Sequence, residues 1–117
     1  MKAMVRVLGL PALLLAGVAC AHTHLRQATP ADGSMLTSAP RQLQLEFSEA
    51  ATVTALSIQK TGDAAPLKLA RLTRRPAAEF RTDLPPLAPG SYQVKWRALS
   101  NDNHLASGSI RFTLRAR

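Results

Sequence analysis

The chain has a single cysteine, few aromatic residues, few acidic residues and no long apolar run after residue 18. One cysteine, Cys20, excludes an internal disulfide, so packing must stabilise the folded part. Aromatic residues make up only 4% of the chain, too few for a platform that stacks nucleic-acid bases. With 15 basic and 7 acidic residues the formal net charge is +8, which we interpret as a solvated basic surface. Such a surface can attract an acidic partner or anionic lipid, but we expect no nucleic acid as a partner.

The first 21 residues have the pattern of an export signal. Two basic residues precede an apolar run over residues 7–18, and Ala19-Cys20-Ala21 is the A-x-A pattern that signal peptidases accept. The run is shorter than the roughly 20 residues that a membrane-spanning helix needs, so we expect no stable membrane anchor. We therefore predict a signal peptide at residues 1–21 and one exported, soluble, periplasmic domain at residues 22–117, expected to be a monomer.

Cys20 offers a different start for the exported chain. A lipid attached to this cysteine would make the protein a lipoprotein that begins at Cys20. Gly17 stands where lipidation signals have an apolar branched residue, so we favour cleavage after Ala21.

Beyond the signal, apolar and polar residues alternate in short runs, which is typical of strands with one buried face. The alternation is clearest over residues 43–47, 92–98 and 110–114, and weaker over residues 25–28, 53–59, 67–72 and 78–82. About seven short strands separated by Gly, Pro and Asp turns predict an all-β fold, a Greek-key β-sandwich or barrel. The predicted core residues are Leu43, Leu45, Phe47, Leu56, Ile58, Tyr92, Val94, Trp96, Ile110, Phe112 and Leu114.

Cleavage after Ala21 would make His22 the first residue, and a terminal histidine can chelate a metal through its α-amine and its imidazole. Asp102 and His104 lie two residues apart in a polar loop, and in extended backbone their side chains would point the same way. If the amino end lies beside this loop, three nitrogens and one carboxylate oxygen suit copper(II) better than zinc or nickel. Binding would weaken in acid, because α-amines titrate near ~8 and imidazoles near ~6.5. By itself, an Asp-x-His pair is more often a loop with an Asx turn and a surface histidine.

His24 allows a second arrangement. The terminal amine, two deprotonated backbone amides and the imidazole of the third residue form a square-planar chelate for copper(II) or nickel(II), and this chelate needs no fold. On a strand, His24 would instead share a face with His22 and add an imidazole to the folded site. A plain surface histidine is the third interpretation.

Six motifs occur in order along the chain: HTHL at 22–25, ATPADGS at 28–34, LEFSE at 45–49, PGSYQVKWRALS at 89–100, Asp102-x-His104, and GSIRF at 108–112. Together they resemble the CopC family of periplasmic copper-resistance proteins over essentially all of residues 22–117. The resemblance implies a cupredoxin-like, immunoglobulin-like β-barrel that binds copper(II) through His22, Asp102 and His104. It also implies a weak or indirect role for Glu49 near the ion, although such a residue is more often a solvated strand-end carboxylate. A role in copper resistance, homeostasis or delivery follows, with a CopD-like inner-membrane copper transporter as a candidate partner.

The chain departs from the best-known family members in its methionine content. Those members have a methionine-rich segment for copper(I), whereas residues 22–117 contain only Met35, which we interpret as a packing residue. We therefore expect no separate copper(I) site.

Two other functions stay open at this point. Copper monooxygenases that cleave polysaccharides also use a histidine brace, which is a terminal histidine chelate with a second histidine. The domain is small for such an enzyme, and Asp102 would occupy a position that oxygen activation needs open, so we favour a protein without enzymatic activity. The remaining alternative is an exported β-sandwich interaction domain without a metal.

Overall fold

The computed structural model describes residues 23–69 and 75–116, and every regular element in these ranges is a β-strand. The described part of the chain contains no helix that could cross a membrane. The strands are β1 (Leu25–Thr29), β2 (Ser34–Leu36), β3 (Gln42–Lys60), β4 (Leu67–Lys68), β5 (Ala77–Asp83), β6 (Gly90–Ser100) and β7 (Leu105–Leu114). The predicted all-β fold is confirmed.

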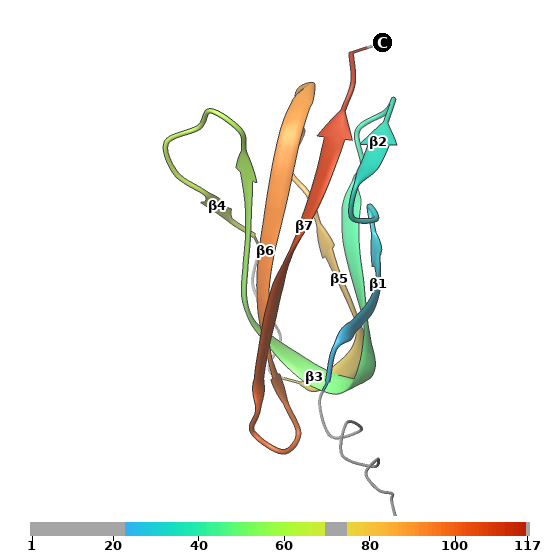
Figure 1. The fold of residues 1–117 in the computed structure, drawn as a ribbon, viewed down its shortest axis with the longest axis vertical. Helices are drawn as coiled ribbons and strands as arrows, with labels where there is room; N and C mark the ends of the chain where they lie inside the picture. Colours follow the sequence, from blue (N-terminus) through green and yellow to red (C-terminus); the bar gives the residue numbers. More distant parts are fainter. Residues whose placement is uncertain (1–22, 70–74, 117) are drawn as a thin grey trace, which may run out of the picture.

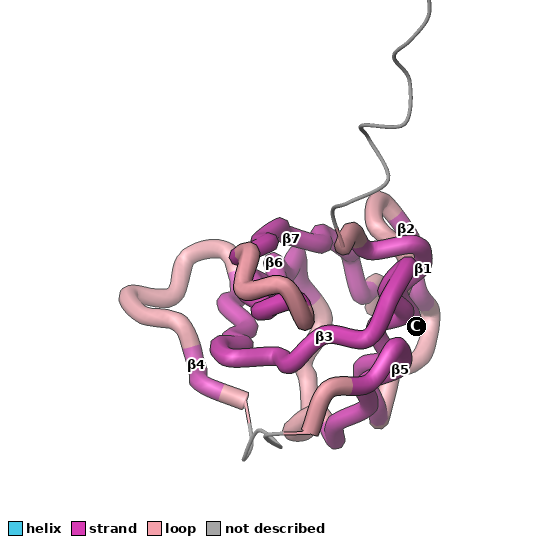
Figure 2. Tube along the Cα trace, turned by 90° about the horizontal axis from the view of Figure 1, so that it is seen from below, coloured by secondary structure: helices cyan, strands magenta, loops and turns pink. Residues whose placement is uncertain are grey.

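All of these strands belong to one hydrogen-bonded sheet that curls around its own core (Figures 1 and 2). The long strand β3 is its centre. The first half of β3 pairs with β1 and β5, and the second half pairs with β4 and β6, all antiparallel. Strand β7 continues the sheet beside β6 and receives the short strand β2 in parallel. Figure 1 shows β3 bending at the lower end of the barrel between its two halves.

Strand β3 unites two segments that the sequence predicts as separate strands. Odd-numbered residues such as Phe47 face the core in its first half, whereas even-numbered residues such as Leu56 face the core in its second half. The pairing with β6 shifts register between Val53 and Ala55. A bulge adds one residue to a strand and so reverses which positions point inward. The interruption in the alternation of buried residues therefore marks a bulge within one strand and not a turn between two strands.

Two predictions about shorter segments need revision. Of the predicted strand over residues 67–72, the structure shows β4 at Leu67–Lys68. Residues 70–72 lie outside the described ranges. Strand β2 was not expected. Its central residue, Met35, pairs with Thr113 and is 66% exposed, so the interpretation of Met35 as a packing residue is wrong. The cause is alternation, because Ser34 and Leu36 turn inward and leave Met35 on the outer face.

The core contains every residue that the alternation predicts to be buried. Phe47 meets Trp96 edge to face with ring centroids 5.4 Å apart, and Tyr92 stacks on Phe112 at 5.3 Å. Trp96 pairs with Gly108 across β6 and β7, and a Cβ atom at position 108 would lie 2.9 Å from the indole ring. Only glycine therefore lets the indole lie against β7 without displacement.

Tyr92 is a core residue whose ionisation lowers the stability of the folded protein at alkaline pH. Burial raises the pKa of the phenol, and the charge of Asp63 raises it further. The phenol also donates a hydrogen bond to the Ala88 carbonyl. The net pKa is raised, so the folded protein retains the proton more tightly than the unfolded chain. The resulting stability is present below about pH 10 and is lost as the pH rises through the higher folded pKa.

We expect the thermal unfolding midpoint to fall as the pH rises above about 10, and to fall less steeply in Tyr92→Phe, because phenylalanine does not titrate. Circular dichroism melts of the two proteins at matched pH values test this. Equal slopes in the two proteins would contradict the assignment to Tyr92.

Candidate metal centre

The N-terminal end of β1 and the loop between β6 and β7 lie at the same end of the barrel, beside the bend of β3 (Figure 1). Ser48 of β3 makes two hydrogen bonds to His24, the residue just before β1. Its backbone N–H donates to the His24 carbonyl at 2.8 Å, and its hydroxyl accepts from the His24 N–H at 3.0 Å. Further along β3, Ala51 pairs with Ser100, the last residue of β6. The bend therefore supports both the start of β1 and the loop.

The register places these two supports on one edge of β3. Ala51 pairs with Ala77 of β5 and with Ser100 of β6, so β5 and β6 lie on opposite edges. Strands β1 and β5 also flank the first half of β3 on opposite edges, and β1 therefore shares an edge with β6. Ser48 and Ala51 are three positions apart, which is about 10 Å of extended strand. The start of β1 and the base of the loop are near neighbours.

The loop formed by residues 101–104 closes a β-hairpin. The Ser100 N–H donates to the His104 carbonyl at 2.9 Å, and the Asn103 N–H donates to the Ser100 carbonyl at 3.0 Å. Asn103 has a positive φ of 66°, a conformation that asparagine tolerates better than most residues. The backbone is thus a turn, and the prediction of an extended Asp-x-His segment is wrong in its geometry.

The turn nevertheless brings the two predicted loop ligands together. Asp102 Oδ2 lies 3.4 Å from His104 Nδ1, and the two side chains are 52% and 55% exposed. Metal–ligand bonds of about 2 Å place neighbouring donor atoms about 3 Å apart, so this pair has a spacing that one ion can bridge. Exposure of this extent leaves the pair accessible to an ion from solvent.

Ser100 organises this pair, although no role was assigned to this residue from the sequence. The residue is only 7% exposed, its hydroxyl donates to Asp102 Oδ1, and the same oxygen accepts from the His104 N–H at 3.1 Å. One buried hydroxyl therefore contacts both candidate ligand residues. The sequence pattern that could have indicated this turn is a serine at a strand end, two residues before an aspartate.

The other candidate ligands are placed less closely. His22 lies outside the described residues. Its neighbour Thr23 is buried, His24 is exposed just before β1, and Glu49 is exposed on β3 between the two supports. Within residues 23–69 and 75–116, no three His, Cys, Asp or Glu side chains gather closely enough to hold a metal ion. The described part of the chain thus brings Asp102 and His104 together and adds neither His24 nor Glu49 to them.

Comparison with known proteins places this geometry in a family. The model of the CopC domain matches residues 25–115. The chain belongs to the CopC family. It is 31% identical over 112 residues to copper resistance protein C of Pseudomonas syringae pv. tomato, with 88% of each chain covered.

Solved structures of CopC proteins show the same fold. The crystal structure of CopC from Methylosinus trichosporium OB3b has a TM-score of 0.65 and 29% identity, covering 82% of this chain and 96% of that one. PcoC from Escherichia coli, a methionine-rich copper resistance protein, has a TM-score of 0.62 and 30% identity. The match covers 81% of this chain and 100% of PcoC. The family resemblance and the β-barrel fold are therefore confirmed, and the relatives connect the chain with copper resistance. In contrast to the description of PcoC, this CopC chain has only 3 methionines.

Proposed function

We propose that the chain is a periplasmic copper(II)-binding protein that captures the ion for copper resistance and hands it on. The proposed ligands are the α-amine and imidazole of His22, the imidazole of His104 and the carboxylate of Asp102, with residues 1–21 removed as a signal peptide. The observation that carries the proposal is the Asp102–His104 pair, arranged 3.4 Å apart at the end of the barrel where β1 begins.

The attachment of the amino end supports this ligand set. The buried side chain of Thr23 and the two hydrogen bonds between His24 and Ser48 fix the backbone two positions from His22. Two residues span about 7 Å at most, and the two supports on β3 are about 10 Å apart. A terminal histidine with its side chain has the reach to meet the loop.

The fold disfavours the competing chelate at the amino end. That chelate would use the deprotonated amide nitrogen of His24 as a ligand. In the folded protein this N–H donates to the Ser48 hydroxyl at 3.0 Å, so the chelate would break a hydrogen bond at the start of β1. The hydrogen bond therefore favours binding by the loop pair, with His24 outside the first set of ligands.

The donor set suits capture and release. Three nitrogens and one oxygen match the tetragonal preference of copper(II), and the bonds from Ser100 arrange two of the donors before the ion arrives. An accessible site with a carboxylate in the ligand set suits transfer better than oxygen chemistry, so we propose no enzymatic activity. A CopD-like inner-membrane copper transporter is the proposed recipient.

The test is to express the complete chain with export, measure the intact mass of the product and titrate it with copper(II). We expect a chain that starts at His22, one tightly bound copper(II) per molecule, and an electron paramagnetic resonance spectrum of a tetragonal site with nitrogen ligands. Repeating the titration in urea separates the folded site from the chelate at the amino end, because only the chelate survives unfolding. A chain that begins at Cys20, or unchanged affinity in urea, would contradict the proposal.

A further inference from the structure

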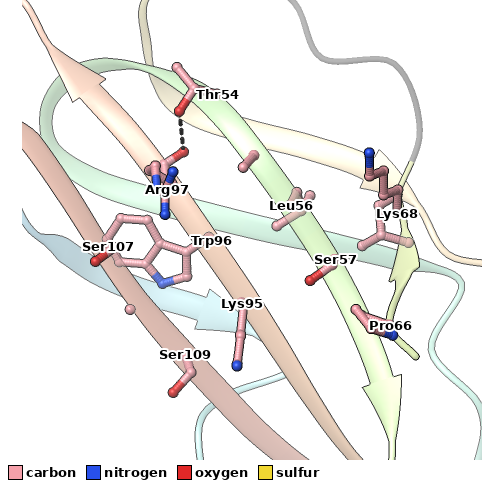
Figure 3. Close-up of a pocket in the computed structure, with 13 residues that line it drawn as sticks. Thr54, Leu56, Ser57, Pro66, Lys68, Lys95, Trp96, Arg97, Ser107 and Ser109 are labelled. Atoms are coloured by element: carbon pink, nitrogen blue, oxygen red, sulfur yellow. Dashed lines mark hydrogen bonds between the residues drawn. The ribbon is translucent and has the colours of Figure 1, made fainter. Parts of the chain in front are cut away.

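The outer face of β4, β3, β6 and β7 contains a groove of about 700 Å³ (Figure 3). Two rows of residues cross these strands side by side. One row is Lys68, Ser57, Lys95 and Ser109, and the next is Ala55, Arg97 and Ser107. The row between them includes Leu56 and Trp96, which are buried in the core, so the two outer rows face away from the core.

The groove has a single sign of charge. Its lining contains three cations, Lys68, Lys95 and Arg97, and no acidic residue. Within the described residues none of the three cations takes part in an ion pair. Lys68 and Lys95 are two strands apart, about 10 Å, and Lys95 and Arg97 are about 7 Å apart along β6. These charges surround a floor of small residues together with the apolar residues Leu56, Pro66, Leu69 and Trp96, and they are open to a ligand.

We propose that this groove binds an extended acidic segment of a partner protein. The cations match carboxylates spaced along a peptide, and Ser57, Ser107 and Ser109 add hydroxyl groups that can donate to carboxylate oxygens. A concave groove accepts a chain segment better than it accepts a flat membrane surface. In Figure 3 the Thr54 hydroxyl donates to the Arg97 carbonyl at 3.3 Å, which ties β3 to β6 at one end of the groove.

The groove lies close to the candidate metal centre without sharing residues with it. Arg97 is three positions before Ser100 on β6, about 10 Å along the strand. A partner bound in the groove would therefore have part of its surface beside the loop that contains Asp102 and His104. The inference goes beyond the proposed copper function and does not depend on it, because the groove needs no metal to bind carboxylates.

The test uses the metal-free protein and a fluorescein-labelled decapeptide of alternating glutamate and serine. A peptide with glutamine in place of glutamate is the uncharged control. We expect fluorescence anisotropy to show binding of the acidic peptide alone, weakening as salt is added. The double variant Lys95→Gln/Arg97→Gln should weaken binding about tenfold at low salt. The matched control Arg41→Gln/Arg115→Gln removes two exposed charges elsewhere and should change affinity less than about twofold.

Three outcomes would overturn this inference. They are an equal loss in both double variants, equal binding of the two peptides, or binding to phosphatidylglycerol vesicles by a protein that ignores the acidic peptide. Copper(II) titration of Lys95→Gln/Arg97→Gln separates the two proposals, since the groove variant should keep full copper affinity. Peptide binding by a protein that fails to bind copper would refute the proposed function alone.

Discussion

Blocking the amino group at position 22, or replacing His104 by alanine, is expected to lower the copper(II) affinity by about 3 kcal/mol or more, which is about 100-fold. Each change removes one nitrogen donor from the proposed set. His104→Ala also leaves Asp102 without the imidazole that lies 3.4 Å from its carboxylate. One additional glycine before His22 is sufficient to displace the terminal amine. Competition titration against a chelator of known affinity measures the loss.

His24→Ala is the matched control, because it removes an exposed histidine that does not join the Asp102–His104 pair. It should bind copper(II) like the unmodified chain. Ser100→Ala should give an intermediate loss of about tenfold, since groups that orient ligands contribute about 10–100-fold, and the exposed Ser107→Ala should give none. Unchanged affinity in the glycine extension and in His104→Ala would refute the loop site. A loss confined to His24→Ala would identify the chelate at the amino end.

Phe47→Ala is expected to lower the free energy of unfolding by about 3–5 kcal/mol. The ring is 1% exposed and packs edge to face against Trp96, so its removal leaves a cavity beside the largest side chain of the core. A domain of this size has a total stability of about 5–15 kcal/mol, so this loss would be a large share. Urea denaturation followed by circular dichroism measures it.

Two further variants serve as controls for the stability loss expected in Phe47→Ala. Phe47→Leu fills part of the space and should lose less than half as much stability as Phe47→Ala. Leu105→Ala changes a side chain that is 67% exposed and should stay within about 0.5 kcal/mol of the unmodified chain. A loss below about 1 kcal/mol in Phe47→Ala would be incompatible with the packing described for this core.

The parts of the fold that the sequence predicted are those where one face of a strand is buried without interruption. Strands β6 and β7 and the first half of β3 alternate regularly, and their inward residues form most of the core. The pairing of Asp102 with His104 was also predictable, because nearby residues in one short loop cannot lie far apart. Family membership followed from motifs spread over most of the chain.

What the sequence did not reveal depends on contacts between distant segments. The continuity of β3 is concealed by the bulge between Val53 and Ala55, which reverses the inward positions. Strand β2 is three residues long and exists because β7 offers an unpaired edge. The basic groove requires Lys68, Lys95 and Ser109 to share one row across four strands, and only the register determines this. The role of Ser100 depends on the turn at Asn103, which no alternation encodes.

Strand β3 holds the beginning of β1 and the end of β6 on one edge, at Ser48 and Ala51. An ion bound by both His22 and His104 would act as a crosslink between segments about eighty residues apart, and closing so long a loop in the unfolded chain is entropically costly. Metal capture and folding would then reinforce each other thermodynamically. A recipient that displaced His22 from this edge of β3 would remove two of the four proposed donor atoms at once.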